Sequence, residues 1–262
     1  MAEPARATAG KALERALPLL DPMARQEGER SAAGYFDLLG PSEPRSTGWI
    51  QDLMLTGMLP RIYERWWRPA LGRAAKGVFG PGMADERRIA RLLLGLSRGE
   101  GVLDVACGTG NFSRGFATTV DEEGLVVGID VSETMLTRAL QDTREAGLDV
   151  AYIRGDAQEL PFVSQSFDAV CCFAAFHLFE DPMRALDRMT EVLTPGGRIA
   201  LFTSVRGRSL PLRTAESLVA MRGGARLFEP DELVQRLRAR GFEEIRQRIT
   251  GITQFIGGRL PA

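Results

Sequence analysis

The sequence predicts an α/β protein built on a doubly wound, mostly parallel sheet, and three observations favour this fold. Five short apolar runs rich in β-branched residues alternate with helical patterns along the middle of the chain. These runs are apolar throughout, as expected of strands that helices cover on both faces. Two further strand patterns follow close together near the C-terminus. The prediction is therefore a Rossmann-like sheet of seven strands with an antiparallel C-terminal hairpin.

The expected elements follow one another in a regular order. Ahead of the first strand, residues 85–96 place Ile89, Leu92, Leu93 and Leu96 on one helical face. After the sheet, Pro230 lies at the start of a helix that stops at Gly241. The strands are expected at residues 101–106, 124–129, 149–153, 167–173, 198–202, 244–250 and 253–257, and helices at residues 112–119, 133–146 and 183–193.

Composition argues against several classes of protein. The 262 residues include 33 basic and 34 acidic side chains, so no long-range field attracts a polyanion such as nucleic acid. Three cysteines are too few for a disulfide framework or a four-cysteine zinc site. The N-terminal residues lack the apolar stretch of a signal peptide, and no run reaches the length of a membrane span. We therefore expect a cytoplasmic protein with no nucleic-acid partner, no stable membrane span and no metal site; the oligomeric state stays open.

The strongest motif is VLDVACGTGNF, which occupies residues 102–112. An apolar strand leads into a turn that contains Gly108 and Gly110 and opens a helix. Glycine lets the backbone adopt positive φ and approach a ligand closely, and the helix N-terminus adds unpaired N–H groups. Dinucleotide-binding proteins use a similar turn, so this motif alone does not choose the ligand.

Three further features favour a different ligand from a dinucleotide. Asp130 closes the second strand, 20 residues beyond Gly110, where a carboxylate can bind both hydroxyls of a ribose. Asp156 follows the third strand, near where an adenine amine would lie. Ser113 replaces the third glycine of the dinucleotide pattern, and Asp104 precedes the turn inside the strand. A pyrophosphate has no use for Asp104, whereas a ligand with an ammonium and a sulfonium group does.

The ordered set of motifs resembles the class I S-adenosylmethionine-dependent methyltransferases. Besides VLDVACGTGNF it contains GIDVSETML, GDAQELPF, FDAVCCFAAFHLFEDP and LTPGGRIAL. The sequence is most similar to the branch that includes the ubiquinone/menaquinone C-methyltransferases, and the resemblance covers residues 101–201. It implies an enzyme of the EC 2.1.1 class with S-adenosyl-L-methionine as its cofactor.

The resemblance also implies a cofactor-binding role for each motif. Asp130 would bind the ribose hydroxyls and Asp156 the adenine amine, although each could instead be a cap at the end of a strand. The methionine part would be held by Asp104, Cys107, Gly108, Thr109 and Gly110; Val131 and Met135 would flank the adenine, the Ala157 backbone would meet its ring nitrogen, and the Phe173 carbonyl would meet the ammonium group.

His177, the single histidine, lies just beyond the fourth strand, at the edge of the sheet where substrates bind in doubly wound folds. An imidazole there could act as a general base, because its usual pKa lies near working pH. It could equally line the substrate pocket or bond to a neighbouring helix. Both interpretations stay open.

We expect an N-terminal extension and helical lid at residues 1–84, ahead of a methyltransferase domain at residues 85–262, and the role of residues 1–48 stays open. The segment at residues 49–71 resembles the variable N-terminal lid of small-molecule methyltransferases. Residues 49–71 contain every tryptophan of the chain. Helical spacing places Tyr63 and Trp67 on one face, where they would form an aromatic roof over the sulfonium and the acceptor. The alternative is that these rings only dock the lid on the sheet.

The expected function is methyl transfer from S-adenosylmethionine to a small, largely apolar acceptor by in-line displacement. The acceptor could be a quinone or phenol carbon, a hydroxyl or an isoprenoid-like lipid. Three alternatives stay open: an RNA or protein methyltransferase, a nicotinamide-dependent oxidoreductase and a non-catalytic cofactor-binding protein.

Overall fold

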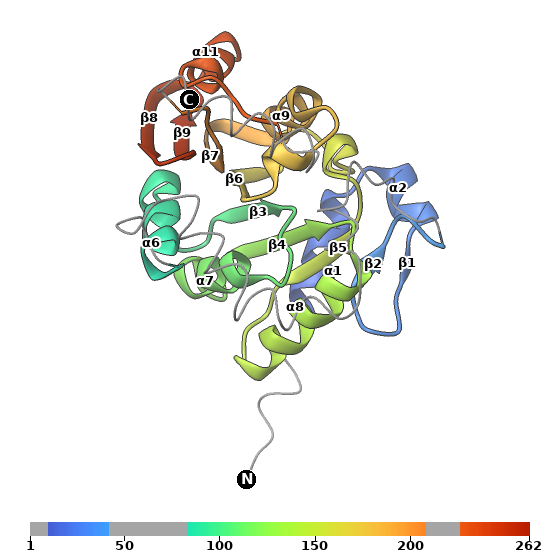
Figure 1. Ribbon diagram of the computed structural model, residues 1–262. Coiled ribbons are helices and arrows are strands. Elements are labelled where there is room, and N and C mark those ends of the chain that lie inside the picture. The colour runs from blue at the N-terminus through green and yellow to red at the C-terminus, as the bar shows by residue number, and fades with distance from the viewer. Residues whose placement is uncertain (1–9, 42–82, 208–225) are drawn as a thin grey trace.

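The computed structural model describes residues 10–41, 83–207 and 226–262. These residues form a nine-stranded sheet in the order β1-β2-β5-β4-β3-β6-β7-β9-β8 (Figure 1). The strands are β1 (Glu29–Arg30), β2 (Phe36–Asp37), β3 (Gly101–Val105), β4 (Leu125–Asp130), β5 (Ala151–Arg154), β6 (Phe167–Phe173), β7 (Leu193–Ser204), β8 (Glu243–Thr250) and β9 (Thr253–Arg259).

The pairing confirms the predicted fold class. Six neighbouring strands, from β2 to β7 across the sheet, run parallel, and β8 and β9 form the antiparallel C-terminal hairpin. The sheet has nine strands rather than the expected seven, because β1 and β2 extend it beyond β5. Each of these strands has two residues, which is too short to show an alternating pattern in the sequence.

Helices cover both faces of the sheet (Figure 1). Side chains of the central strands alternate between two cores: Val126 points into one, and its neighbours Leu125 and Val127 into the other. One face carries α6 (Met83–Leu94), α7 (Asn111–Val120) and α8 (Glu133–Glu145), and the other carries α1 (Lys11–Ala16), α9 (Pro182–Glu191) and α11 (Glu232–Ala239). The chain also forms α2 (Pro22–Glu27) and short 3-10 helices at η1 (Leu17–Leu19), η3 (Ala157–Glu159) and η4 (Phe176–Leu178).

The strand order reverses between β3 and β6. The chain continues from β3 to β4 and β5 on one side, and from β6 to β7 on the other. Loops that leave the carboxyl ends of β3 and β6 therefore diverge, and doubly wound sheets bind ligands in the crevice this leaves. The glycine turn after β3 and His177 after β6 both lie at this edge.

Residues 10–41 pack against the sheet. Asp149 accepts a hydrogen bond from the Ala12 N–H at 2.9 Å, at the start of α1. Arg15 donates to the carbonyls of Glu123 and Gly124 at 2.8 and 2.7 Å, where β4 begins. The N-terminal extension thus includes sheet strands, and its division from the catalytic domain at residues 84 and 85 stays a prediction.

The expected aromatic roof lies outside the described residues, because Tyr63 and Trp67 fall in the segment 42–82. Within the described part of the chain, every helix is too short or too polar to cross a membrane.

Candidate functional site

The turn after β3 has the backbone conformation that its glycines predict. Gly108 and Gly110 have φ of 56° and 71°, and Gly110 is the N-cap of α7. The Gly110 N–H donates to the Cys107 carbonyl at 3.0 Å, which closes the turn. A Cβ on Gly110 would lie 2.2 Å from the Tyr152 hydroxyl oxygen. Position 110 therefore excludes a side chain by both its φ and its contact with β5.

Asp130 ends β4 and joins two loops. Its Oδ2 accepts a hydrogen bond from the Gly108 N–H at 2.8 Å, and its Oδ1 accepts one from the Ser132 N–H at 2.9 Å. Burial raises the pKa of the Asp130 carboxyl, and the backbone donors oppose this rise by stabilising the charged form. An ionised carboxylate offers about four acceptor positions, so positions remain for the two hydroxyls of a ribose.

Asp104 lies beneath the glycine turn and is 2 % exposed. Its Oδ2 accepts a hydrogen bond from the Ser113 hydroxyl at 2.6 Å, and its Oδ1 accepts one from the Cys171 thiol at 3.5 Å. Burial raises the pKa of Asp104 to about 6, although both hydrogen bonds oppose the rise. A cation bound above the turn would favour the ionised carboxylate.

The cysteines near the turn are free thiols. Burial raises the pKa of Cys107 and Cys171 well above the ordinary thiol value, so both stay protonated at neutral pH. The Cys107 Sγ lies against Gly128, where a Cβ would approach it to 2.8 Å. Cys107 therefore fills the space beneath the turn as a small apolar side chain.

The residues expected around the adenine follow β4 and β5. Asp156 is half-buried, and its Oδ1 accepts a hydrogen bond from the Gln158 N–H at 2.8 Å. Asp156 thus caps η3, as the alternative interpretation predicts, and this contact occupies one of its two oxygens. Ala157 and Met135 are buried, and Val131 is half-buried. Their contact with a cofactor stays a prediction.

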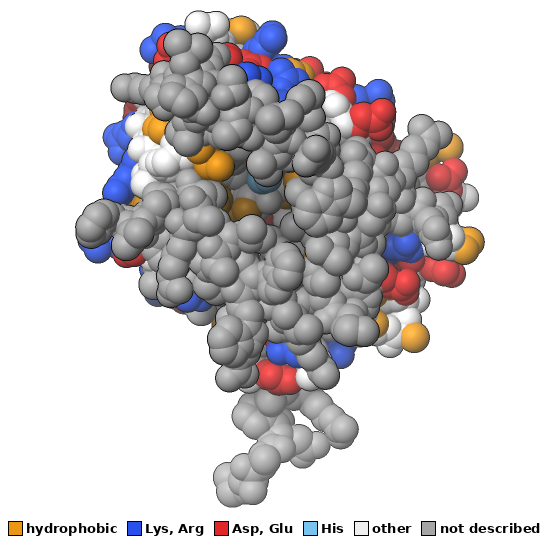
Figure 2. All heavy atoms as spheres, viewed as in Figure 1, with side chains coloured by type: hydrophobic (Ala, Val, Ile, Leu, Met, Phe, Trp, Pro, Cys, Tyr) orange, Lys and Arg blue, Asp and Glu red, His pale blue; other side chains and the backbone are white. Residues whose placement is uncertain are grey.

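Phe173 and His177 lie on the β6 side of the edge. Phe173 ends β6, and its ring packs 4.5 Å from that of Phe112 between centroids. His177 lies in η4, with its Nδ1 3.4 Å from the Thr203 hydroxyl. Figure 2 shows the single histidine of the chain in a hollow beside hydrophobic side chains. Burial lowers the pKa of His177 to about 4, so the imidazole is neutral at pH 7.

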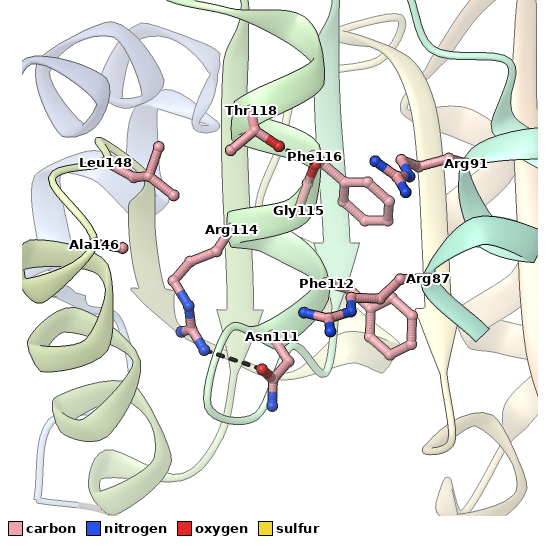
Figure 3. Close-up of a pocket in the computed structure, with 10 residues that line it drawn as sticks. All are labelled: Arg87, Arg91, Asn111, Phe112, Arg114, Gly115, Phe116, Thr118, Ala146 and Leu148. Atoms are coloured by element: carbon pink, nitrogen blue, oxygen red, sulfur yellow. Dashed lines mark hydrogen bonds between the residues drawn. The ribbon is translucent and has the colours of Figure 1, made fainter. Parts of the chain in front are cut away.

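A separate groove of about 430 Å³ runs along the outer side of α7 (Figure 3). Arg87 and Arg91 of α6 line it together with Arg114 of α7. Arg114 donates to the Asn111 side chain at 3.1 Å and to the Thr109 carbonyl at 2.6 Å. Arg114 therefore holds the glycine turn from the outside, while none of the carboxylates discussed above lines the groove.

Among the residues that the structure describes, no group of three or more histidine, cysteine, aspartate or glutamate side chains is arranged to hold a metal ion.

A family model described as a methyltransferase domain matches residues 102–197. The chain contains a methyltransferase domain. Its sequence relatives include an uncharacterized chloroplastic methyltransferase of Arabidopsis thaliana, 34 % identical over 160 residues, which are 59 % of this chain and 44 % of that protein. The demethylmenaquinone methyltransferase of Listeria welshimeri is 40 % identical over 115 residues, 44 % of this chain and 49 % of that protein. The ubiquinone/menaquinone biosynthesis C-methyltransferase of Idiomarina loihiensis is 38 % identical over 110 residues, 41 % of this chain and 44 % of that protein.

These matches confirm the predicted resemblance to S-adenosylmethionine-dependent methyltransferases and to their quinone-methylating branch. The chain spans less than half the length of each of these curated relatives.

Solved structures confirm the fold of the methyltransferase domain. Phosphoethanolamine N-methyltransferase 2 of Haemonchus contortus, solved with S-adenosyl-L-methionine, has a TM-score of 0.57 and 18 % identity, covering 77 % of this chain and 60 % of that one. The [4+2]-cyclase SpnF has a TM-score of 0.61 and 19 % identity, covering 84 % of this chain and 98 % of that one. Because a cyclase shares the fold, the fold alone does not assign the reaction.

Several residues of the site carry no signal that sequence analysis could use. Tyr152 closes the space beneath Gly110, and Arg114 holds Thr109. Arg154 lies directly before the Gly155-Asp156 motif but bonds to Asp37, 117 residues earlier. Only the position of Arg154 next to a motif could have drawn attention to it.

The Tyr152 contact predicts the effect of a side chain at position 110. We expect Gly110→Ala to lower the free energy of unfolding by about 1–2 kcal/mol for its positive φ and by a further 1–3 kcal/mol for overpacking. Gly147→Ala is the matched control, because Gly147 has φ of 65° and open space around its Cβ position. Urea unfolding measures both variants, and equal losses would contradict the steric role of Tyr152.

The buried Asp104 predicts a pH dependence of stability. Its pKa is about 6 in the folded chain against 3.8 for an ordinary carboxyl, so the folded state holds the proton more tightly than the unfolded state does. This stabilisation is present below pH 3.8 and is lost as the pH rises through 6. Asp104→Asn cannot ionise, so we expect its stability relative to the wild type to rise by about 1–3 kcal/mol between acidic and neutral pH.

Urea unfolding of the ligand-free proteins at about pH 4 and about pH 7.5 tests this expectation. Asp121→Asn is the control, because Asp121 is exposed and pairs with Arg98 at the far end of α7. If the free energies of unfolding of Asp104→Asn and the wild type differed by the same amount at both pH values, the predicted role of Asp104 would be wrong.

Proposed function

We propose that this chain transfers a methyl group from S-adenosylmethionine to a small, largely apolar acceptor. One observation supports this most strongly: the Asp130 carboxylate joins the glycine turn to the loop after β4 and keeps acceptor positions for a ribose. The arrangement lies at the edge where the strand order reverses, within the methyltransferase domain.

The residues at this edge fit the parts of the cofactor. Asp130 would bind the ribose, and the turn at residues 108–110 would hold the methionine part above Asp104. When bound, S-adenosylmethionine supplies an electrophilic methyl group on a sulfonium. The contribution of the chain is to position the donor against the acceptor and to exclude water, which suits a direct displacement.

We infer that the acceptor is an uncharged, apolar molecule. Behind His177, the fully buried rings of Phe176 and Phe228 stack at 5.5 Å between centroids, and the Phe179 ring meets that of Phe176 edge-on at 5.9 Å, so this core supports the imidazole from below. His177 adds a neutral polar group to these rings. The quinone-methylating names of relatives agree with such an acceptor, and we infer that a reduced quinone ring carbon is the preferred nucleophile.

We infer that His177 lines the acceptor pocket rather than acting as the general base. An effective general base has a pKa close to working pH, and that of His177 is about 4. Its contact with the Thr203 hydroxyl fixes the orientation of the ring. The neutral imidazole would then line the pocket and offer a hydrogen bond to the acceptor.

Calorimetry with S-adenosylhomocysteine tests the cofactor assignment. We expect Asp130→Asn to weaken binding by about 1.5–3 kcal/mol, because one carboxylate oxygen is replaced by an amide donor facing a backbone N–H. Asp121→Asn, an exposed change far from the site, is expected to bind like the wild type. Absence of wild-type binding at roughly millimolar ligand would overturn the proposed function.

Turnover with reduced demethylmenaquinone as the acceptor tests the inferred role of His177. We expect His177→Gln to lower kcat by less than about tenfold, whereas loss of a general base costs about 10²–10⁴-fold. The pH profiles of variant and wild type are expected to have the same shape above pH 6, because His177 is already neutral there. A loss of a hundredfold or more, or a changed profile, would show that His177 is the base.

A further inference from the structure

The segment 31–40, here called the strap, runs beside the adenosine end of the candidate site. It lies outside the matched domain at residues 102–197. Its strand β2 pairs in parallel with β5, with Asp37 opposite Arg154. The Leu38 N–H continues this pairing by donating to the Arg154 carbonyl at 3.0 Å. The strap therefore ends beside Gly155 and Asp156, the motif expected to meet the adenine.

Arg154 links the strap to the loop after β4. Its guanidinium is buried, with 7 % of the residue exposed. The Nε donates to the Val131 carbonyl at 3.2 Å, while Nη1 donates to Asp37 Oδ2 at 3.0 Å and to the Gly40 carbonyl at 2.5 Å. A guanidinium is a rigid, planar fork, so these acceptors are fixed relative to one another. Val131 thus takes its position partly from the strap.

Asp37 is held in place to receive Arg154. Its Oδ1 accepts hydrogen bonds from the Leu39 and Gly40 N–H groups at 2.9 and 3.1 Å, which forms a tight turn within the strap. The Asp37 side chain is 11 % exposed and that of Arg154 is 8 % exposed. Loss of one partner of a buried ion pair leaves the other uncompensated, so the two residues depend on each other.

A second contact holds the other end of the same loop. Tyr35 is 1 % exposed, and its hydroxyl donates to Glu133 Oε1 at 2.7 Å. Glu133 is the first residue of α8, directly after Ser132. The strap therefore contacts the chain on both sides of Ser132, the residue whose N–H binds Asp130.

We propose that the strap supports the adenosine half of the cofactor site, and that Asp37 and Arg154 are positioning residues for it. Arg154 holds the Val131 carbonyl on one side of the expected adenine position and is joined through Gly155 to Asp156 on the other. Gly155 packs between the two segments, because a Cβ there would lie 2.9 Å from Ile129 Cδ1 of β4 and 3.8 Å from Leu38 Cδ1 of the strap. This proposal rests on the proposed cofactor, and it assigns to residues 31–40 a role in cofactor affinity.

The test compares two ligands by calorimetry on the full chain: S-adenosylhomocysteine, and 5′-methylthioadenosine, which lacks the amino-acid part. Asp37→Asn keeps an oxygen for the turn but turns an amide donor toward the guanidinium. We expect this variant to bind both ligands more weakly than the wild type, with the two affinities lowered by the same factor of about ten. Asp104→Asn, beneath the methionine part, is expected to weaken S-adenosylhomocysteine alone.

Arg15→Gln is the matched control within the same N-terminal extension. It removes the bonds of α1 to the Glu123 and Gly124 carbonyls, where β4 begins, and leaves the strap contacts in place. We expect both affinities to stay within about twofold of the wild type. Tyr35→Phe is a milder variant that keeps the ring, and we expect it to weaken both ligands in the same direction as Asp37→Asn.

Hydrogen exchange of the ligand-free proteins provides a readout that is independent of the cofactor. We expect faster exchange at the Val131 and Ser132 amides in Asp37→Asn, and wild-type exchange there in Arg15→Gln. Unchanged exchange, or equal losses of affinity in Asp37→Asn and Arg15→Gln, would overturn the role of the strap. If the wild type bound neither ligand, the proposed function would fail and the adenosine role with it, while exchange would still report whether the strap holds the loop.

Discussion

One carboxylate at the end of β4 organises the candidate site. Asp130 accepts N–H groups from the turn after β3 and from the loop after β4, so a single side chain fixes the spacing of two loops. Burying this charge is unfavourable, as its raised pKa indicates, and the backbone donors offset part of that cost. On the far side of the same loop, the Val131 carbonyl is held by the Arg154 guanidinium. The loop after β4 is thus held by two buried charges of opposite sign: the Asp130 carboxylate binds the Ser132 N–H, and the Arg154 guanidinium binds the Val131 carbonyl.

Local patterns in the sequence predicted most of the fold. The apolar runs and the glycine turn are recognisable because their physical causes, burial on both faces and positive φ, act on neighbouring residues. The strands β1 and β2 escaped prediction because pairing with distant residues, rather than local pattern, creates them. The same holds for Asp37 and Arg154, which are 117 residues apart. The lowered pKa of His177 also depends on burial, which sequence cannot supply.

The fold and the reaction are determined by different parts of the molecule. A cyclase and a phosphoethanolamine methyltransferase share this sheet at less than 20 % identity, so the sheet is a scaffold for more than one chemistry. Around η4, stacked aromatic rings and a neutral imidazole lie together, and the Arg226 guanidinium lies 5.1 Å from the centre of the Phe228 ring.

The two short strands of the N-terminal extension also cover one edge of the parallel sheet. Without them β5 would be the edge of the parallel sheet, with a row of unpaired backbone groups open to another chain. β2 pairs with that edge, and β1, only two residues long and formed by the charged Glu29 and Arg30, is the outermost strand on this side among the residues that the structure describes. A short, charged outer strand is a poor template for further pairing. Residues 29–37 therefore cover the β5 edge, and we expect a fragment trimmed to the matched domain, which leaves that edge unpaired by them, to be more prone to edge-to-edge association.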